Sequence, residues 1–120
     1  MTPTDAMERI NTILAHAWMV RNFLKHAEEI EEDDEFLQVH REIYDFIRAV
    51  EPSYQRKDSK EYLSRLKRKL PKLRKASDFF SAEYTNVSSH TNFAMAAQSL
   101  AGCVQQIHEI LDNISKDESE

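Results

Sequence analysis

Apolar side chains recur every three or four residues in four separate stretches of this chain. That spacing puts them on one side of an α-helix, because a helix completes a turn in about 3.6 residues. The chain also contains only one Gly and three Pro among its 120 residues. Sheet proteins need many turns, which favour those two residues. The sequence therefore predicts a few long helices in place of a sheet.

The first half of the chain predicts two helices. We expect the first over about 5–30, with Thr4 as its N-cap. The second is expected over about 35–50, because Pro52 disfavours helical backbone in the residue before it. The segment 51–58 then forms the one real linker of the chain.

The second half predicts two more helices. The third begins after Asp58, a good N-cap, and its apolar stripe keeps its phase through Pro71 to about residue 84. This continuity predicts one helix with a kink at the proline. The fourth helix is expected over 91–114, and an acidic, frayed tail over 115–120 follows it.

Four amphipathic helices with short connections favour an all-α, up-down antiparallel four-helix bundle. A chain of this length forms one domain, which we place at 1–114. The longest uncharged stretch, 91–108, contains Asn, Gln and Ser, whereas a membrane span needs about 20 mainly apolar residues. One Cys and a polar start unlike a signal peptide predict a cytoplasmic location.

Charge is divided into three blocks along the chain. Residues 1–55 carry 5 Lys and Arg against 12 Asp and Glu, a net charge of −7. Residues 56–75 carry 10 against 2, a net charge of +8, and residues 76–120 carry 1 against 7, a net charge of −6. Opposed blocks of this size either pair with each other or offer a basic surface to an anionic partner.

The basic block falls on the third predicted helix, around the side that its leucines leave free. One interpretation is a solvated face that pairs with acidic neighbours such as the run 28–35. Another is contact with the phosphates of RNA or DNA, and a third is contact with an acidic protein or membrane surface. The candidate basic surface consists of Arg65, Lys67, Arg68, Lys72, Arg74 and Lys75.

The fourth predicted helix has no charged residue between 91 and 108. An exposed helix of a bundle usually carries charge on its outer side. The stretch therefore predicts either a central, well-packed helix or the interface of a homodimer. A close helix crossing would explain Gly102, which is costly in mid-helix, and Cys103 is expected to be a small buried residue.

Two polar residues fall among the apolar residues of their helices. Arg21 is expected either to extend to water or to pair with a buried carboxylate. His40 occupies a similar position on the second helix, where a satisfied core or interface histidine is the ordinary interpretation. If these two meet His90 or His108 across the bundle, they form a polar pocket for a small anion.

The histidines do not have the spacing of a metal site. Carboxylate-bridged di-iron bundles use Glu-x-x-His pairs, and no His here has a Glu three residues before it. We therefore predict no metal, no cofactor and no catalytic residue from the spacing of the side chains alone.

Residues 21–26 read Arg-Asn-Phe-Leu-Lys-His. An Arg and a His at this spacing resemble the Arg-x4–6-His motif of HEPN ribonucleases, which are small helical bundles and often dimers. The resemblance covers six residues of the first predicted helix, whereas that family places its motif near the start of a late helix. It implies cleavage of RNA, with Arg21 and His26 as the candidate residues.

Together these observations predict a small cytoplasmic interaction or accessory protein, homodimeric and without catalytic chemistry of its own. Two alternatives remain open: a protein that binds nucleic acid or another anion through 56–75, and a HEPN-like ribonuclease. RNA binding that falls steeply with salt would favour the first alternative. RNA cleavage abolished by His26→Ala would favour the second.

Overall fold

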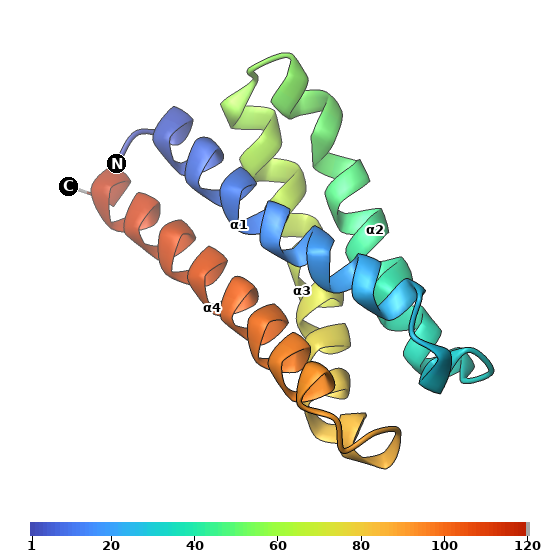
Figure 1. Ribbon diagram of the computed structural model, residues 1–120. Helices are drawn as coiled ribbons and strands as arrows, with labels where there is room; N and C mark the ends of the chain where they lie inside the picture. The colour runs from blue at the N-terminus through green and yellow to red at the C-terminus, as the bar shows by residue number, and fades with distance from the viewer. Residues whose placement is uncertain (120) are drawn as a thin grey trace.

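The computed structural model describes the backbone of residues 1–119 and the side chains of residues 1–114. It confirms the predicted all-α, four-helix fold (Figure 1). The up-down order of all four helices and a kink at Pro71 stay predictions. The helices are α1 (Pro3–Lys25), α2 (Asp34–Gln55), α3 (Ser59–Glu83) and α4 (Thr91–Ser119), with short 3-10 turns η1 (Glu28–Ile30) and η2 (Tyr84–Asn86).

The N-cap of α1 is Thr2, and the predicted cap at Thr4 is wrong. The Thr2 hydroxyl accepts from the backbone N–H of Asp5 at 3.1 Å, and the Asp5 carboxylate accepts from the backbone N–H of Thr2. This reciprocal pair satisfies two N–H groups that a helix start leaves unpaired. At the other end α1 stops at Lys25, before the predicted end near 30, because Ala27 adopts extended backbone.

Helix α2 passes through Pro52, so the predicted stop there is wrong. Its end is instead set by a turn at Lys57, whose φ of 57° is left-handed. The N–H of Asp58 donates to the carbonyl of Ser53 at 2.9 Å, the six-to-one bond of a Schellman motif. The predicted linker 51–58 is therefore mostly the last turns of α2.

Helix α3 begins as predicted, because the Asp58 carboxylate accepts from the N–H of Glu61 at 3.1 Å. The helix continues without interruption past Pro71, which is exposed. Helix α4 extends beyond the predicted end at residue 114. The fraying of the tail 115–120 stays a prediction, and the side chains of these residues lie outside the described part of the structure.

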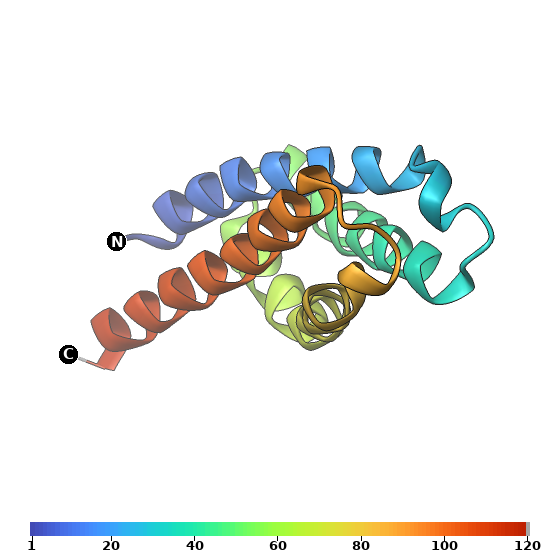
Figure 2. The ribbon, with the colours of Figure 1, turned by 60° about the horizontal axis from the view of Figure 1, so that its bottom comes forward.

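Neighbouring helices run in opposite directions where ring and hydrogen-bond contacts show their register. Trp18 packs on Tyr44, and Glu8 accepts from Tyr54, so α1 and α2 are antiparallel. Phe23 packs on Phe93 at the opposite end of α1, which makes α4 antiparallel to α1 as well. The two chain termini consequently lie at the same end of the molecule (Figures 1 and 2).

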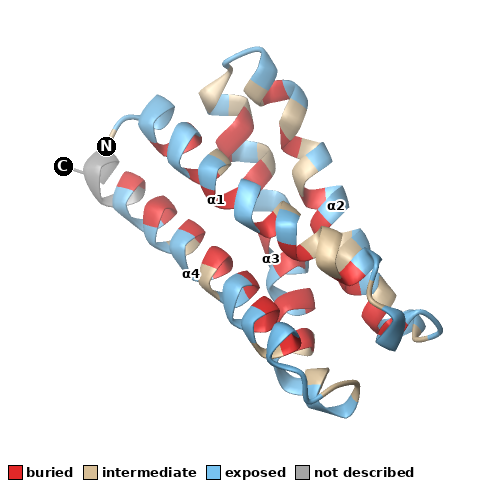
Figure 3. Cartoon of the chain, viewed as in Figure 1, coloured by how far each residue is buried: buried red, intermediate tan, exposed pale blue. Residues whose placement is uncertain are grey.

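The core lies between the four helices, and the buried residues follow the apolar stripes read from the sequence (Figure 3). The most extensive packing is between α2 and α3 and between α1 and α4. In the described part of the chain, no helix has a stretch apolar enough, at sufficient length, to cross a bilayer.

Candidate functional site

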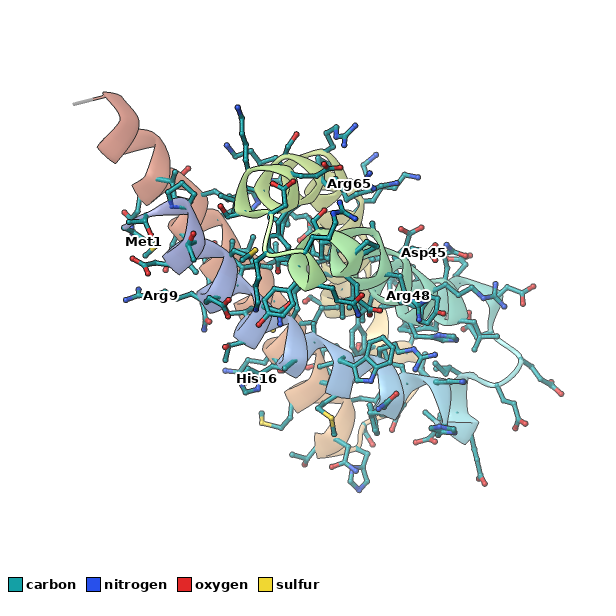
Figure 4. All side chains as sticks on the ribbon, turned by 90° about the horizontal axis from the view of Figure 1, so that it is seen from above. Met1, Arg9, His16, Asp45, Arg48 and Arg65 are labelled. Carbon is teal, nitrogen blue, oxygen red and sulfur yellow. The ribbon has the colours of Figure 1, made fainter. Side chains whose placement is uncertain are left out.

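The basic residues of α3 form a strongly charged surface of the described chain. Six of the seven side chains are exposed and Arg65 is half-buried. Figure 4 shows the molecule from above, and side chains that end in nitrogen atoms extend outward near the labelled Arg65. We call this surface the cationic face: Arg65, Lys67, Arg68, Lys69, Lys72, Arg74 and Lys75.

Almost none of this charge is neutralised by ion pairs. Among the described side chains, only Arg65 of the cationic face has an ion pair, with Nε at 2.8 Å from Glu61 Oε1. The predicted pairing with the acidic run 28–35 is not found among residues 1–114. Six positive charges are thus exposed without an ion pair to any described carboxylate.

A groove runs along the surface where α2 and α3 pack together, beside the cationic face. It has a volume of about 620 Å³. Buried Val39 and Ala76 form its floor, and the half-buried ring of Phe79 lies at one end. Its two rims carry opposite charges, acidic on α2 and basic on α3. We call it the α2–α3 groove, lined by Asp34, Glu35, Gln38, Val39, Glu42, Lys72, Lys75, Ala76 and Phe79.

The groove continues along the helices into two smaller hollows. The first shares Glu42 and Lys72 with the groove and adds Asp45 and Lys69. The second, of about 410 Å³, has only cationic side chains around Ala49. The number of acidic lining residues therefore falls from the groove to the second hollow, where every charged lining residue is basic. We call the groove and the two hollows together the furrow. The second hollow is lined by Ala49, Arg65, Arg68, Lys69 and Lys72.

Sequence reasoning missed Lys69 and Phe79. Lys69 lies four residues after Arg65 and three before Lys72, a spacing that places all three on one side of a helix. That signal was present in the sequence. Phe79 follows the same edge of α3, but its exposure depends on how it packs against the start of α2, which the sequence does not show.

Arg21 is half-buried, and it has no ion pair with a carboxylate among the described residues. Its guanidinium carbon lies 4.6 Å from the centroid of the Trp18 ring and 5.0 Å from that of Tyr44, distances typical of cation–π contacts. Nη1 donates to Asn22 Oδ1 at 3.0 Å, while Nε is buried without a partner among the described residues. The aromatic rings thus contact the guanidinium group, and its extension to water stays a prediction.

His40 lies close to Arg21, as the predicted pocket requires. Burial lowers the pKa of His40 below its ordinary value of 6.5, and the positive charges of Arg21, Arg41 and Lys25 lower it further. Its Nδ1 is buried and unpartnered among the described residues. Neither residue lines any of the described cavities, and the polar pocket stays a prediction.

The other two histidines lie elsewhere. His108 lies beside the part of α1 near Glu8. This follows because α1 and α4 are antiparallel and Cys103, five residues earlier, contacts Ile13. The part near Glu8 is about 13 residues from Arg21, or about 20 Å along the helix. His90 is exposed before α4, and its Nδ1 accepts from the N–H of Asn92 at 3.0 Å. No described contact joins either histidine to the Arg21–His40 pair.

Arg21 and His26 do not share a face of α1. Five residues apart, they are rotated by about 140° around a helix, and Arg21 is enclosed by rings while His26 is exposed at the C-cap. The HEPN-like ribonuclease stays a prediction that the structure does not test.

A second surface, on α1 and α4, has no charge. Met19 and Met95 are the most exposed large apolar side chains described, at 64% and 54%. Met95 lines a hollow together with His16, Gln98, Ser99, Gly102, Cys103 and Gln106, and Met19 lies about one helical turn along α1 from His16. A Cβ on Gly102 would meet no atom within 4 Å, so the close crossing expected there does not occur within the chain.

Cys103 is buried, as expected, and burial raises the pKa of its thiol. The thiol lies 3.6 Å from the carbonyl oxygen of Ile13. Among the described residues, no three His, Cys, Asp or Glu side chains are grouped so that they could hold a metal ion. Comparison with protein-family models, with curated proteins and with solved structures finds no match to this chain.

Proposed function

We propose that this protein is an interaction protein that binds an acidic segment of another protein through the cationic face. The observation that carries the proposal is the absence of ion pairs from six of its seven side chains within the described residues. Folding has gathered these charges on one helix without compensating them. An acidic partner would gain their attraction, which steers association and sets specificity.

A protein partner fits this surface better than a nucleic acid does. Glu42 and Asp45 line the hollow beside Lys72 and Lys69. These carboxylates would repel a continuous phosphate backbone, whereas a peptide can place basic residues next to them and acidic residues next to the lysines. Base stacking needs exposed aromatic rings, whereas Tyr62 of α3 is fully buried. The net charge of −5 also opposes long-range attraction of nucleic acid.

Binding of a labelled, Glu-rich 16-residue peptide, followed by fluorescence anisotropy, tests the proposal. We expect binding that weakens as NaCl rises, and that is lost in the double variant Arg68→Glu, Lys69→Glu. The matched control, Arg9→Glu with Arg41→Glu, changes net charge equally at exposed positions outside α3. Equal loss in both variants, or no binding by the native protein, would contradict the proposal.

Nucleic-acid binding is the second candidate, and the same unpaired cations favour it. A labelled single-stranded RNA of 20 nucleotides serves as its probe. Tighter binding of the RNA than of the peptide, with a logarithmic salt slope of about −0.7 per phosphate contacted, would replace the first candidate by the second.

We also propose that the uncharged α1–α4 surface pairs two copies of the chain. Contact between two uncharged surfaces avoids the repulsion that two chains of net charge −5 would otherwise feel. Exposed Met19 and Met95 supply apolar area, and the open space at Gly102 admits a close approach. Light scattering over a range of protein concentrations tests this pairing, and Met95→Lys should shift the mass toward one chain.

A further inference from the structure

We propose that the α2–α3 groove binds an amphipathic α-helix of the partner protein, with the C-terminal end of that helix over Arg65 and Arg68. This inference rests on the proposed function and specifies the conformation and charge pattern of the partner segment. Three features of the groove carry it: an apolar floor, rims of opposite charge, and a purely cationic end.

The shape of the groove suits a helix. Its α2 rim runs from Asp34 to Glu42, which at about 1.5 Å per residue is about 12 Å. With the two hollows, the furrow reaches Ala49, about 22 Å from Asp34 and equal to a helix of about 15 residues. A strand partner would need a free sheet edge, and the described chain consists of helices and their connections.

The apolar residues at the base of the groove favour a partner helix with a stripe of apolar side chains. Val39 and Ala76 lie at the base of the groove and are almost fully buried. The apolar surface open to a partner therefore comes mainly from the ring of Phe79 and the methylene stems of Lys72 and Lys75. The ring of Phe79 is half-buried against Phe36, with centroids 5.0 Å apart. Side chains that repeat at three- and four-residue spacing on a partner helix would cover this base, as in other helix-in-groove complexes.

The rims select the charges on either side of that stripe. Glu35 and Glu42 on α2 favour basic residues on one edge of the partner, while Lys72 and Lys75 on α3 favour acidic residues on the other. Neither lysine has an ion pair among the described residues. A helix with acidic residues on both edges would meet repulsion at α2, so the two rims discriminate between arrangements of charge.

The cationic end selects a direction. Arg65 and Arg68 lie in the hollow that has no acidic residue. The C-terminal end of a helix carries a partial negative charge and would gain from this position, as would Glu residues in its last turn. The partner helix is thereby oriented parallel to α2 and antiparallel to α3.

The test uses synthetic 16-residue peptides carrying fluorescein. The matched peptide has Leu at three- and four-residue spacing, a Lys edge, a Glu edge and two Glu in its last turn. A second peptide has Ser in place of Leu, and a third has its edges exchanged. The third peptide can place its Lys edge at α2 and its Glu edge at α3 only by binding in the opposite direction. Its C-terminal Glu residues then lie far from Arg65 and Arg68.

We expect the matched peptide to bind at least about tenfold more tightly than either of the others. The variant Lys72→Glu with Lys75→Glu should lose about tenfold in affinity. A matched peptide with Lys on both edges should recover affinity for that variant. The control variant is Arg9→Glu with Arg41→Glu, which makes the same change of net charge at exposed positions outside the cationic face and the groove, and it should bind the matched peptide nearly as well as the native chain.

The outcomes separate this inference from the proposed function. If the Ser peptide binds as tightly as the Leu peptide, acidic segments are recognised but the groove is not used, and only the inference fails. The same holds if the control variant loses as much affinity as the groove variant. If neither these peptides nor the Glu-rich peptide binds, both proposals fail. Circular dichroism of each variant confirms that it is folded.

Discussion

Replacement of Gly102 by Ala should stabilise the single chain. Gly102 lies inside α4, and a Cβ built there meets no atom within 4 Å. Glycine in mid-helix is less favourable than alanine by about 0.5–1 kcal/mol, because more backbone freedom is lost on folding. No contact within the chain offsets that gain, so the whole difference should be measurable.

The expected shift in melting temperature follows from the size of the chain. Unfolding entropy near 60 °C is about 2.1 cal/mol/K per residue, or about 0.25 kcal/mol/K for 120 residues. The gain from Gly102→Ala therefore raises the melting temperature by about 2–4 °C. Urea denaturation, at a concentration where light scattering finds one chain per particle, measures the free energy directly.

Ala101→Gly is the matched control for this experiment. Ala101 is the exposed neighbour of Gly102, and the reverse substitution there should cost about 0.5–1 kcal/mol. A loss of stability in Gly102→Ala at low concentration would refute the reasoning, because it would require a close contact that the structure does not contain.

The same variant also reports on the proposed pairing of two chains. If a second copy packs against α4 at Gly102, the added methyl group should weaken that contact. Its stabilising effect would then shrink or reverse as protein concentration rises. A gain that is independent of concentration would contradict a close approach of two chains at this residue.

Three further predictions concern buried and titrating side chains. Tyr62→Phe removes a buried hydroxyl that has no partner among the described residues; we expect no loss, and a gain of up to about 1 kcal/mol, in urea denaturation, whereas a clear loss would show that the hydroxyl is bonded. Burial and the charge of Arg21 lower the pKa of His40, so the unfolded chain binds the proton more readily, and stability should be full above pH 6.5 and fall as the pH drops through the pKa of the folded state. His40→Gln should remove that part of the pH profile, and identical profiles would contradict this assignment. The hydrogen bond from Tyr54 lowers the pKa of Glu8, so its stabilisation is present above 4.5, is lost as the pH falls further, and should be absent from the melting profile of Glu8→Gln.

The sequence alone determined the helices, because helical periodicity is a local property. Each stripe of apolar residues had to be buried, and most of the residues that the spacing placed on these stripes are buried in the core. The cap at Asp58 was equally local, since it depends on bonds within three residues. The end of α2 was predicted wrongly, although it too is set by a local turn. Pro52 indicated an earlier end, whereas the helix ends in a Schellman turn at Lys57, where the sequence lacks the glycine that usually marks such a turn.

Only the tertiary structure decided which charges and polar atoms find partners. The charge blocks predicted attraction between segments, but ion pairs need side-chain atoms within a few ångströms, and helix register determines that distance. It placed Arg21 against two aromatic rings and His108 far from His40. It also left Lys72 unpaired beside an apolar groove, a surface composed of two helices whose lateral contact no single stretch of sequence encodes.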